Sequence, residues 1–197
     1  MTRVEKVLRD VAAALDARGH RFALIGGLGV SARTEPRFTR DVDWAVAVRG
    51  DPEAESVVHD LVEAGYSILM TVEQDVTHRL ATVRLLPPDE APTGVVADLL
   101  FASSGVEPEL VAAADAMEIL PGIRVPVARV GHLIALKVLS VVPSRPQDAA
   151  DLRALLAVAA QSDLELARQA LTLIETRGFA RGKRLLESFE RLVTDRQ

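Results

Sequence analysis

Apolar residues recur at every third or fourth position along the first 20 residues, with polar residues between them. This spacing predicts an amphipathic helix that ends at Gly19. A short helix is expected over residues 28–33. A longer one should start at Asp51 and Pro52, because an acidic residue followed by proline is typical of a first helical turn.

Short apolar runs bounded by turn residues predict strands in the first two thirds of the chain. They cover residues 21–25, 41–48, 67–72, 78–86 and 94–102, with a hairpin at 117–120 and 123–127, and the Pro-rich stretch 87–93 is the expected turn between the last two long strands. Beyond residue 129 the pattern is helical, with helices expected over 130–142, 145–159, 163–177 and 183–194. We therefore expect an α+β (α/β) protein with a core at 1–128 and a helical region at 129–197.

The amino-acid composition limits the classes of protein to which the chain can belong. A chain of 197 residues with 49% hydrophobic content can bury a substantial core. Its net charge of -5 argues against a protein that coats nucleic acid through bulk charge. The absence of cysteine excludes disulfides and cysteine-ligated zinc. No signal peptide and no membrane-length apolar run are visible, so a cytoplasmic protein with no membrane contact is expected.

The polar stretch between the first two strands carries the candidate chemistry. Gly26 and Gly27 follow the first strand, and glycines there allow the backbone to turn sharply and to approach a bulky ligand. The free N–H groups of the following helix would then face an anion such as a phosphate. A double glycine also occurs in ordinary tight turns, so the alternative is a turn without a ligand.

Two aspartates, Asp41 and Asp43, open the next strand. Side chains alternate along a strand, so both carboxylates lie on one face, while Val42 and Trp44 point to the other, where we expect Trp44 to belong to the core. Neighbouring carboxylates repel unless a cation lies between them, and such oxygen ligands suit Mg²⁺ or Mn²⁺. The alternative is a solvated strand face with two surface acids. A phosphatase built on this motif fits less well, because that class commonly has threonine where Trp44 stands.

Asp98 lies within an apolar strand, where an unpaired charge would be costly. If this strand lies beside Asp41 and Asp43, Asp98 becomes the base or third metal ligand of a phosphoryl-transfer site. Otherwise it is a buried acid bonded to a loop backbone.

Lys137 falls within the apolar stripe of the helix at 130–142, so its ammonium either reaches the surface or meets an anion. In the next segment Ser144 and Gln147 have the spacing of a helix capping box. Asp148 and Asp151 share a face of that helix. Near the C-terminus, Arg177, Arg181, Lys183 and Arg184 form a basic cluster that is either a solvated helix end or a surface for RNA phosphates.

These motifs, in this order, resemble the nucleotidyltransferase superfamily related to polymerase β. Within it, the chain is most similar to the AbiEii-like toxins of type IV toxin–antitoxin systems. The similarity rests on the double glycine, the stretch "RFTRDVD" with Arg37 and Thr39, the segment "DLLFASSG", the helix "HLIALKVLS" and the segment "RPQDAADL", over roughly residues 20–156. One difference is Gly27, because many members have serine there.

The resemblance implies a mixed-sheet core followed by a helical bundle, and an enzyme that transfers a nucleoside monophosphate from an NTP to an acceptor hydroxyl with release of pyrophosphate. Asp41, Asp43 and Asp98 would hold Mg²⁺ or Mn²⁺, with Asp98 helping to deprotonate the acceptor and Lys137 contributing to catalysis. The nucleotide would contact Gly26, Gly27, Arg37, Thr39, Lys137, Asp148 and Asp151. The acceptor would be an RNA, plausibly a tRNA end, and a cognate antitoxin would be a partner.

Two other functions are compatible with the same residues. One is a nucleotidyltransferase that modifies an antibiotic or another small molecule. The other is a degenerate member that only binds a partner, although the complete set of three aspartates argues against this. The sequence does not identify the NTP, the acceptor, the antitoxin or the oligomeric state.

Overall fold

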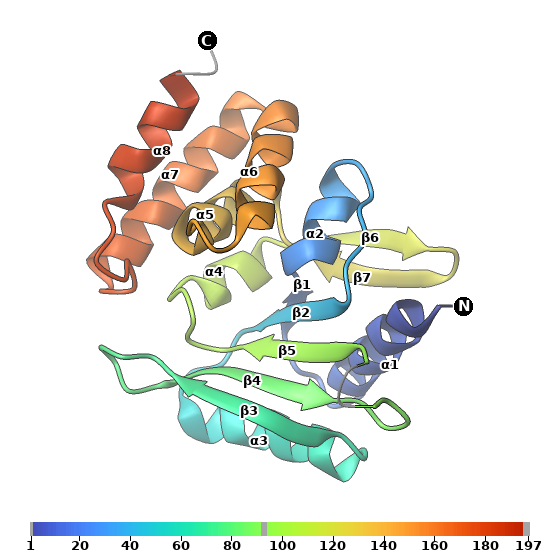
Figure 1. The fold of residues 1–197 in the computed structure, drawn as a ribbon. Coiled ribbons are helices and arrows are strands. Elements are labelled where there is room, and N and C mark those ends of the chain that lie inside the picture. Colours follow the sequence, from blue (N-terminus) through green and yellow to red (C-terminus); the bar gives the residue numbers. More distant parts are fainter. Residues whose placement is uncertain (1, 92–93, 195–197) are drawn as a thin grey trace.

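The computed structural model describes residues 2–91 and 94–194. Helices and strands alternate in the first part and helices dominate the second (Figure 1). The elements are α1 (Arg3–Ala17), β1 (Phe22–Leu24), α2 (Gly26–Arg33), β2 (Asp41–Val46), α3 (Asp51–Glu63), β3 (Ser67–Glu73), β4 (Leu80–Leu86), β5 (Val96–Leu100), α4 (Glu107–Ala112), β6 (Asp115–Leu120), β7 (Ile123–Val127), α5 (Val130–Ser140), α6 (Pro146–Val158), α7 (Gln161–Thr176) and α8 (Leu185–Thr194).

Seven strands form one mixed sheet in the order β3-β4-β5-β2-β1-β7-β6. β2 pairs in parallel with β5, and β1 in parallel with β7, whereas the other neighbours are antiparallel. The expected α+β fold with a mixed sheet and a C-terminal group of helices is confirmed. β3 forms one edge, and all seven of its residues are exposed.

Two hydrophobic clusters cover opposite faces of the sheet. One joins α1 and α3 to inward-facing residues of β2, β4, β5 and β7. Trp44 is fully buried in this cluster and meets Phe22 edge to face, with ring centroids 5.3 Å apart. The expectation that Trp44 belongs to the core is therefore confirmed.

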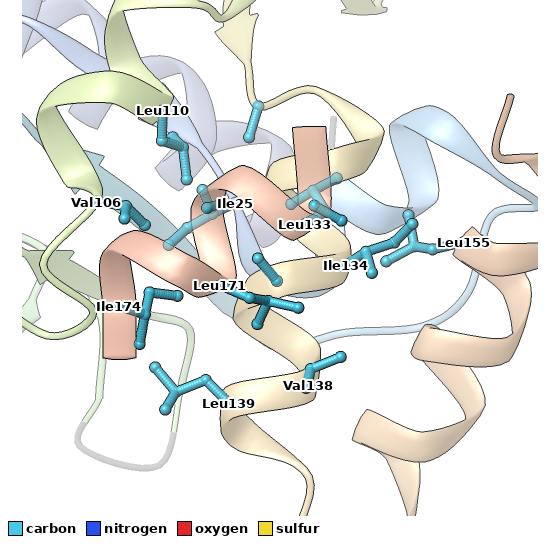
Figure 2. Close-up of a cluster of buried hydrophobic side chains, with 14 of the residues drawn as sticks. Ile25, Val106, Leu110, Leu133, Ile134, Val138, Leu139, Leu155, Leu171 and Ile174 are labelled. Carbon is cyan, nitrogen blue, oxygen red and sulfur yellow. The ribbon is translucent and has the colours of Figure 1, made fainter. Parts of the chain in front are cut away.

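The second cluster joins the sheet to α4 and the C-terminal helices (Figure 2). Ile25 at the end of β1 lies among Leu133 and Ile134 of α5 and residues of α4, α6 and α7. Residues on both sides of position 128 share this cluster. The division into 1–128 and 129–197 stays a prediction about how the chain is organised.

Most element boundaries agree with the sequence pattern to within a few residues, with three differences. The helix expected from residue 28 begins at Gly26, and the short helix α4 has no counterpart in the predicted elements. The capping role predicted for Ser144 is wrong, because α6 begins after Arg145 and no side chain caps it. The turn expected at 87–93 includes residues 92 and 93, which lie outside the described residues.

Over residues 2–91 and 94–194, none of the helices combines the length and the apolar character needed to cross a membrane.

Replacing Ile134 by alanine should lower the free energy of unfolding by about 3 kcal/mol, because a fully buried side chain at the junction of sheet and helices would leave a cavity. Urea denaturation measures the change. Val158→Ala is the control, since Val158 is half exposed and its loss should cost no more than about 0.5 kcal/mol. Equal effects of the two substitutions would contradict this packing.

Candidate active site

A cleft of about 650 Å³ lies between the sheet and helices α2, α5 and α6. It brings together almost every residue that the sequence singled out. The cleft is lined by Gly26, Gly27, Arg37, Thr39, Asp41, Asp43, Asp98, Lys137 and Asp148, among others. Asp151 is the exception, and it contacts the lining through ion pairs with Arg37 and Lys137.

The glycine pair leaves no space for side chains at the start of α2. Gly26 has a φ of +59°, and a Cβ atom there would lie 1.8 Å from Oδ2 of Asp43. A Cβ on Gly27 would lie 2.7 Å from Nη2 of Arg37 and 3.0 Å from Oγ1 of Thr39. Both glycines therefore allow functional side chains to lie directly against the helix N-terminus.

Strand register places the three aspartates on one patch of the sheet. Asp41 and Asp43 share a face of β2, and Asp43 lies opposite Asp98 in the parallel pairing with β5. Asp98 in turn lies opposite Arg84 in the antiparallel pairing of β5 with β4. Asp43, Asp98 and Arg84 therefore form a row across three neighbouring strands.

Arg84 neutralises the buried Asp98. Its Nε and Nη2 donate to the two carboxylate oxygens of Asp98 at 2.8 and 2.7 Å, a bidentate ion pair. Sequence reasoning missed Arg84. The signal in the sequence is limited to a single charged residue, Arg84, within the otherwise uncharged segment 80–86.

The carboxylates affect one another electrostatically. Burial raises the pKa of Asp43 to about 6, and the nearby charges of Asp98 and Asp41 add to the rise, while Lys137 and Arg84 oppose it. A cation bound between these carboxylates would reduce their mutual repulsion and so lower the free energy of the site.

The donor set fits a divalent cation at Asp41 and Asp43. Both are hard oxygen ligands on one face, and a cation between them would reduce the repulsion that, together with burial, raises the pKa of Asp43. Among the described residues, no group of three or more histidines, aspartates and glutamates is arranged to hold a metal ion. Both oxygens of Asp98 accept hydrogen bonds from Arg84, whereas Asp41 and Asp43 have no ion pair with any described residue.

A second group of charges borders the cleft on the side of α5 and α6. Nζ of Lys137 lies 2.7 Å from both Asp148 and Asp151, and Arg37 donates to the two oxygens of Asp151 at 2.6 and 2.7 Å. Burial acts to raise the pKa of Asp151, but hydrogen bonds from Arg37, Lys137 and Gln147 outweigh this effect and lower the pKa. Lys137 is thus buried and paired with anions of the protein, rather than extended to the surface.

The C-terminal basic cluster makes mainly intramolecular contacts. Arg177 pairs with Glu109, Arg181 donates to Ser103, and Lys183 donates to the carbonyls of Leu139 and Val141. Arg181 also lines the cleft.

Comparison with family models shows to which class of protein this chain belongs. Residues 7–197 match the model of the nucleotidyl transferase AbiEii toxin of type IV toxin–antitoxin systems. The chain therefore belongs to this family of nucleotidyltransferases, and the resemblance seen in the sequence is confirmed. Nucleotidyltransferases of this kind generally use a divalent metal. A comparison with curated protein sequences gives no match.

Solved structures share the fold at low sequence identity. The solution structure of the antibiotic-resistance factor ANT(2'')-Ia has a TM-score of 0.59 at 18% identity, covering 90% of this chain and 94% of that one. The same factor in complex with adenylyl-2''-tobramycin gives 0.58 at 16% identity, covering 87% and 98%. An antigenic nucleotidyltransferase-like protein from Paracoccidioides brasiliensis gives 0.52 at 17%, covering 89% and 88%.

Gly26→Ala should displace the carboxylate of Asp43 and lower nucleotide transfer by about a hundredfold or more, because small displacements of reacting groups are costly. Gly122→Ala is a matched control: Gly122 also has a positive φ, of +77°, but nothing lies within 4 Å of its added Cβ. Transfer assays and thermal melting on both variants separate the clash from backbone strain. Similar losses of transfer in both would contradict a specific role for the space at Gly26.

The raised pKa of Asp43 predicts a pH-dependent stability difference from Asp43→Asn. In metal-free buffer, the wild type should lose stability relative to the variant as pH rises from about 4 to about 6, because folding must bury an ionised Asp43 and hold it near other carboxylates. The loss is on the order of 3 kcal/mol. Urea denaturation at several pH values measures it, and a difference that is constant or grows in favour of the wild type would contradict the assignment.

Proposed function

We propose that the chain transfers a nucleoside monophosphate from an NTP to a hydroxyl at an RNA end, plausibly of a tRNA, and that it acts as a toxin under the control of a cognate antitoxin. The observation that carries the catalytic part is the Asp41 and Asp43 pair, which lies against the glycine turn at the start of α2. The description of the family supports the toxin role and the antitoxin, and the RNA acceptor is what the resemblance in the sequence implies.

In this reaction the acceptor oxygen forms a bond to the α-phosphorus, the bond from that phosphorus to the β-bridging oxygen breaks, and pyrophosphate leaves. A bound Mg²⁺ or Mn²⁺ ion would supply charge neutralisation for the triphosphate and the leaving group. Asp41 and Asp43 would hold this ion. The backbone N–H groups at Gly26 and Gly27 would bind phosphate oxygens at the helix N-terminus.

The positive side chains of the cleft have distinct proposed tasks. Lys137 and Arg37 would bind the triphosphate, and both are held in place by Asp151. Asp98 would accept the proton of the acceptor hydroxyl. Since both of its oxygens accept hydrogen bonds from Arg84, this role requires a free lone pair on Asp98 or the opening of one Arg84 contact.

Asp41→Asn should reduce transfer of label from an NTP to RNA by about a hundredfold or more, since a metal ligand is lost. The assay incubates purified protein with Mg²⁺, each labelled NTP in turn and total RNA. Asp16→Asn is the control, because Asp16 is an exposed aspartate on α1 that lies outside the cleft. Thermal melting shows whether the variants remain folded.

The outcomes separate the candidate functions. Label in a tRNA-sized band, from one NTP and only with Asp41 intact, supports the proposal. Label that appears only with a small-molecule acceptor such as an aminoglycoside indicates the small-molecule alternative. Absence of metal-dependent NTP binding would contradict both and favour a protein that only binds a partner.

A further inference from the structure

A second cleft, also of about 650 Å³, lies outside the catalytic site. It is bounded by the start of α3, the β3–β4 turn, the β5–α4 loop and the segment after α7. We refer to it as the arginine cleft, because four arginines from separate parts of the chain line it: Arg21, Arg49, Arg79 and Arg177.

The acidic residues of the arginine cleft are largely engaged by some of these arginines. Glu53 pairs with Arg49 at 3.2 Å, and Glu109 pairs with Arg177 at 2.7 Å. The side chain of Arg21 is exposed and makes no hydrogen bond or ion pair with any residue that the structure describes. Arg79 pairs with Asp51 at 3.3 Å, so Arg21 is the one arginine of this cleft without an ion pair to a described residue.

Three buried polar atoms that belong to residues lining the arginine cleft have no hydrogen-bond partner among the described residues: Nη2 of Arg79, Oγ1 of Thr77 and Oε2 of Glu107. Orphaned buried polar atoms are uncommon in folded proteins and are costly unless something outside the protein bonds to them. Six such side-chain atoms occur over residues 2–91 and 94–194, and three of them belong to residues of this one cleft.

The chemistry of these groups indicates an anion rich in acceptors. Arg79 offers a free guanidinium N–H and Thr77 offers a hydroxyl, while Arg21 adds a mobile positive charge at the rim. Glu107 is 2% exposed, and burial raises the pKa of its carboxyl, while hydrogen bonds from Ser104 and Ser103 oppose the rise. Phosphate oxygens match a set of guanidinium and hydroxyl donors.

We propose that the arginine cleft binds a phosphate group of a ligand other than the NTP in the catalytic cleft. Arg79 and Thr77 hold the phosphate inside, and Arg21 attracts it at the rim. The phosphate belongs either to a free phosphorylated molecule or, if the proposed RNA acceptor is correct, to the backbone of that RNA as it continues past the catalytic cleft.

The β3–β4 turn and the β5–α4 loop contribute residues to both the arginine cleft and the catalytic cleft. Oε1 of Glu107 accepts hydrogen bonds from the backbone N–H groups of Ser103 and Ser104 at 2.9 and 2.7 Å, and both serines line the catalytic cleft. The turn that carries Thr77 and Arg79 also carries residues 73–75, which line the catalytic cleft. A phosphate bound at Arg79 and Thr77, beside Glu107, would thus order both boundaries of the catalytic cleft.

The test is a titration of the purified full chain without divalent metal, followed by phosphorus NMR for inorganic phosphate and by calorimetry for a short single-stranded RNA. Arg79→Gln should weaken phosphate binding about tenfold, since a charge-assisted hydrogen bond is lost. Arg21→Gln should weaken it by a smaller factor and leave the thermal melting unchanged, because the exposed side chain of Arg21 makes no hydrogen bond or ion pair with a described residue. Arg153→Gln is the charge-matched control, since Arg153 is exposed on α6 and outside both clefts.

Weakening of both phosphate and RNA binding by Arg79→Gln and Arg21→Gln supports a site for the acceptor backbone. Weakening of phosphate binding alone supports a site for a free phosphorylated molecule. Equal affinities in wild type, Arg21→Gln and Arg79→Gln would overturn the proposal, because the phosphate would then bind elsewhere. These measurements involve no transfer reaction, so failure of the proposed function and failure of this site give different results.

Discussion

The parallel pairing of β2 with β5 is the constraint on which the catalytic face depends. It sets Asp43 opposite Asp98, and the antiparallel pairing of β5 with β4 extends the row to Arg84. Because side chains alternate along strands, a slip of one residue in either pairing would move a carboxylate or its counter-ion to the opposite face of the sheet. The hydrophobic residues between them, which pack under α1 and α3, therefore also determine where the charges lie.

Charge balance around the cleft follows from this arrangement. Arg84 on β4 compensates the charge of Asp98. Lys137 on α5 and Arg37 in the loop between α2 and β2 compensate the charges of Asp148 and Asp151. Asp43 has no such partner of its own, and burial together with the charges of Asp98 and Asp41 raises its pKa to about 6. A cation bound beside the glycine turn would therefore relieve the repulsion among these carboxylates.

Local patterns predicted the parts of the site that depend on neighbours in sequence. The shared face of Asp41 and Asp43 follows from strand alternation, and the glycine turn follows from residue type. Arg84 could not be assigned, because its partner is set by strand pairing between segments that sequence periodicity does not relate. The helix α4 spans six residues, too few to show a helical repeat, and the expected cap at Ser144 failed because α6 starts after Arg145. The arginine cleft combines residues from distant segments, so no local pattern reveals it.

The position of Trp44 has a spectroscopic consequence. It is the only tryptophan of the chain, and it lies on β2 directly after Asp43, with its ring fully buried on the opposite face of the sheet. Intrinsic tryptophan fluorescence of this protein therefore comes from the strand that carries the carboxylate pair. Any event that exposes or repacks that strand changes the emission of this single tryptophan, and excitation at wavelengths that Tyr66 does not absorb isolates its signal.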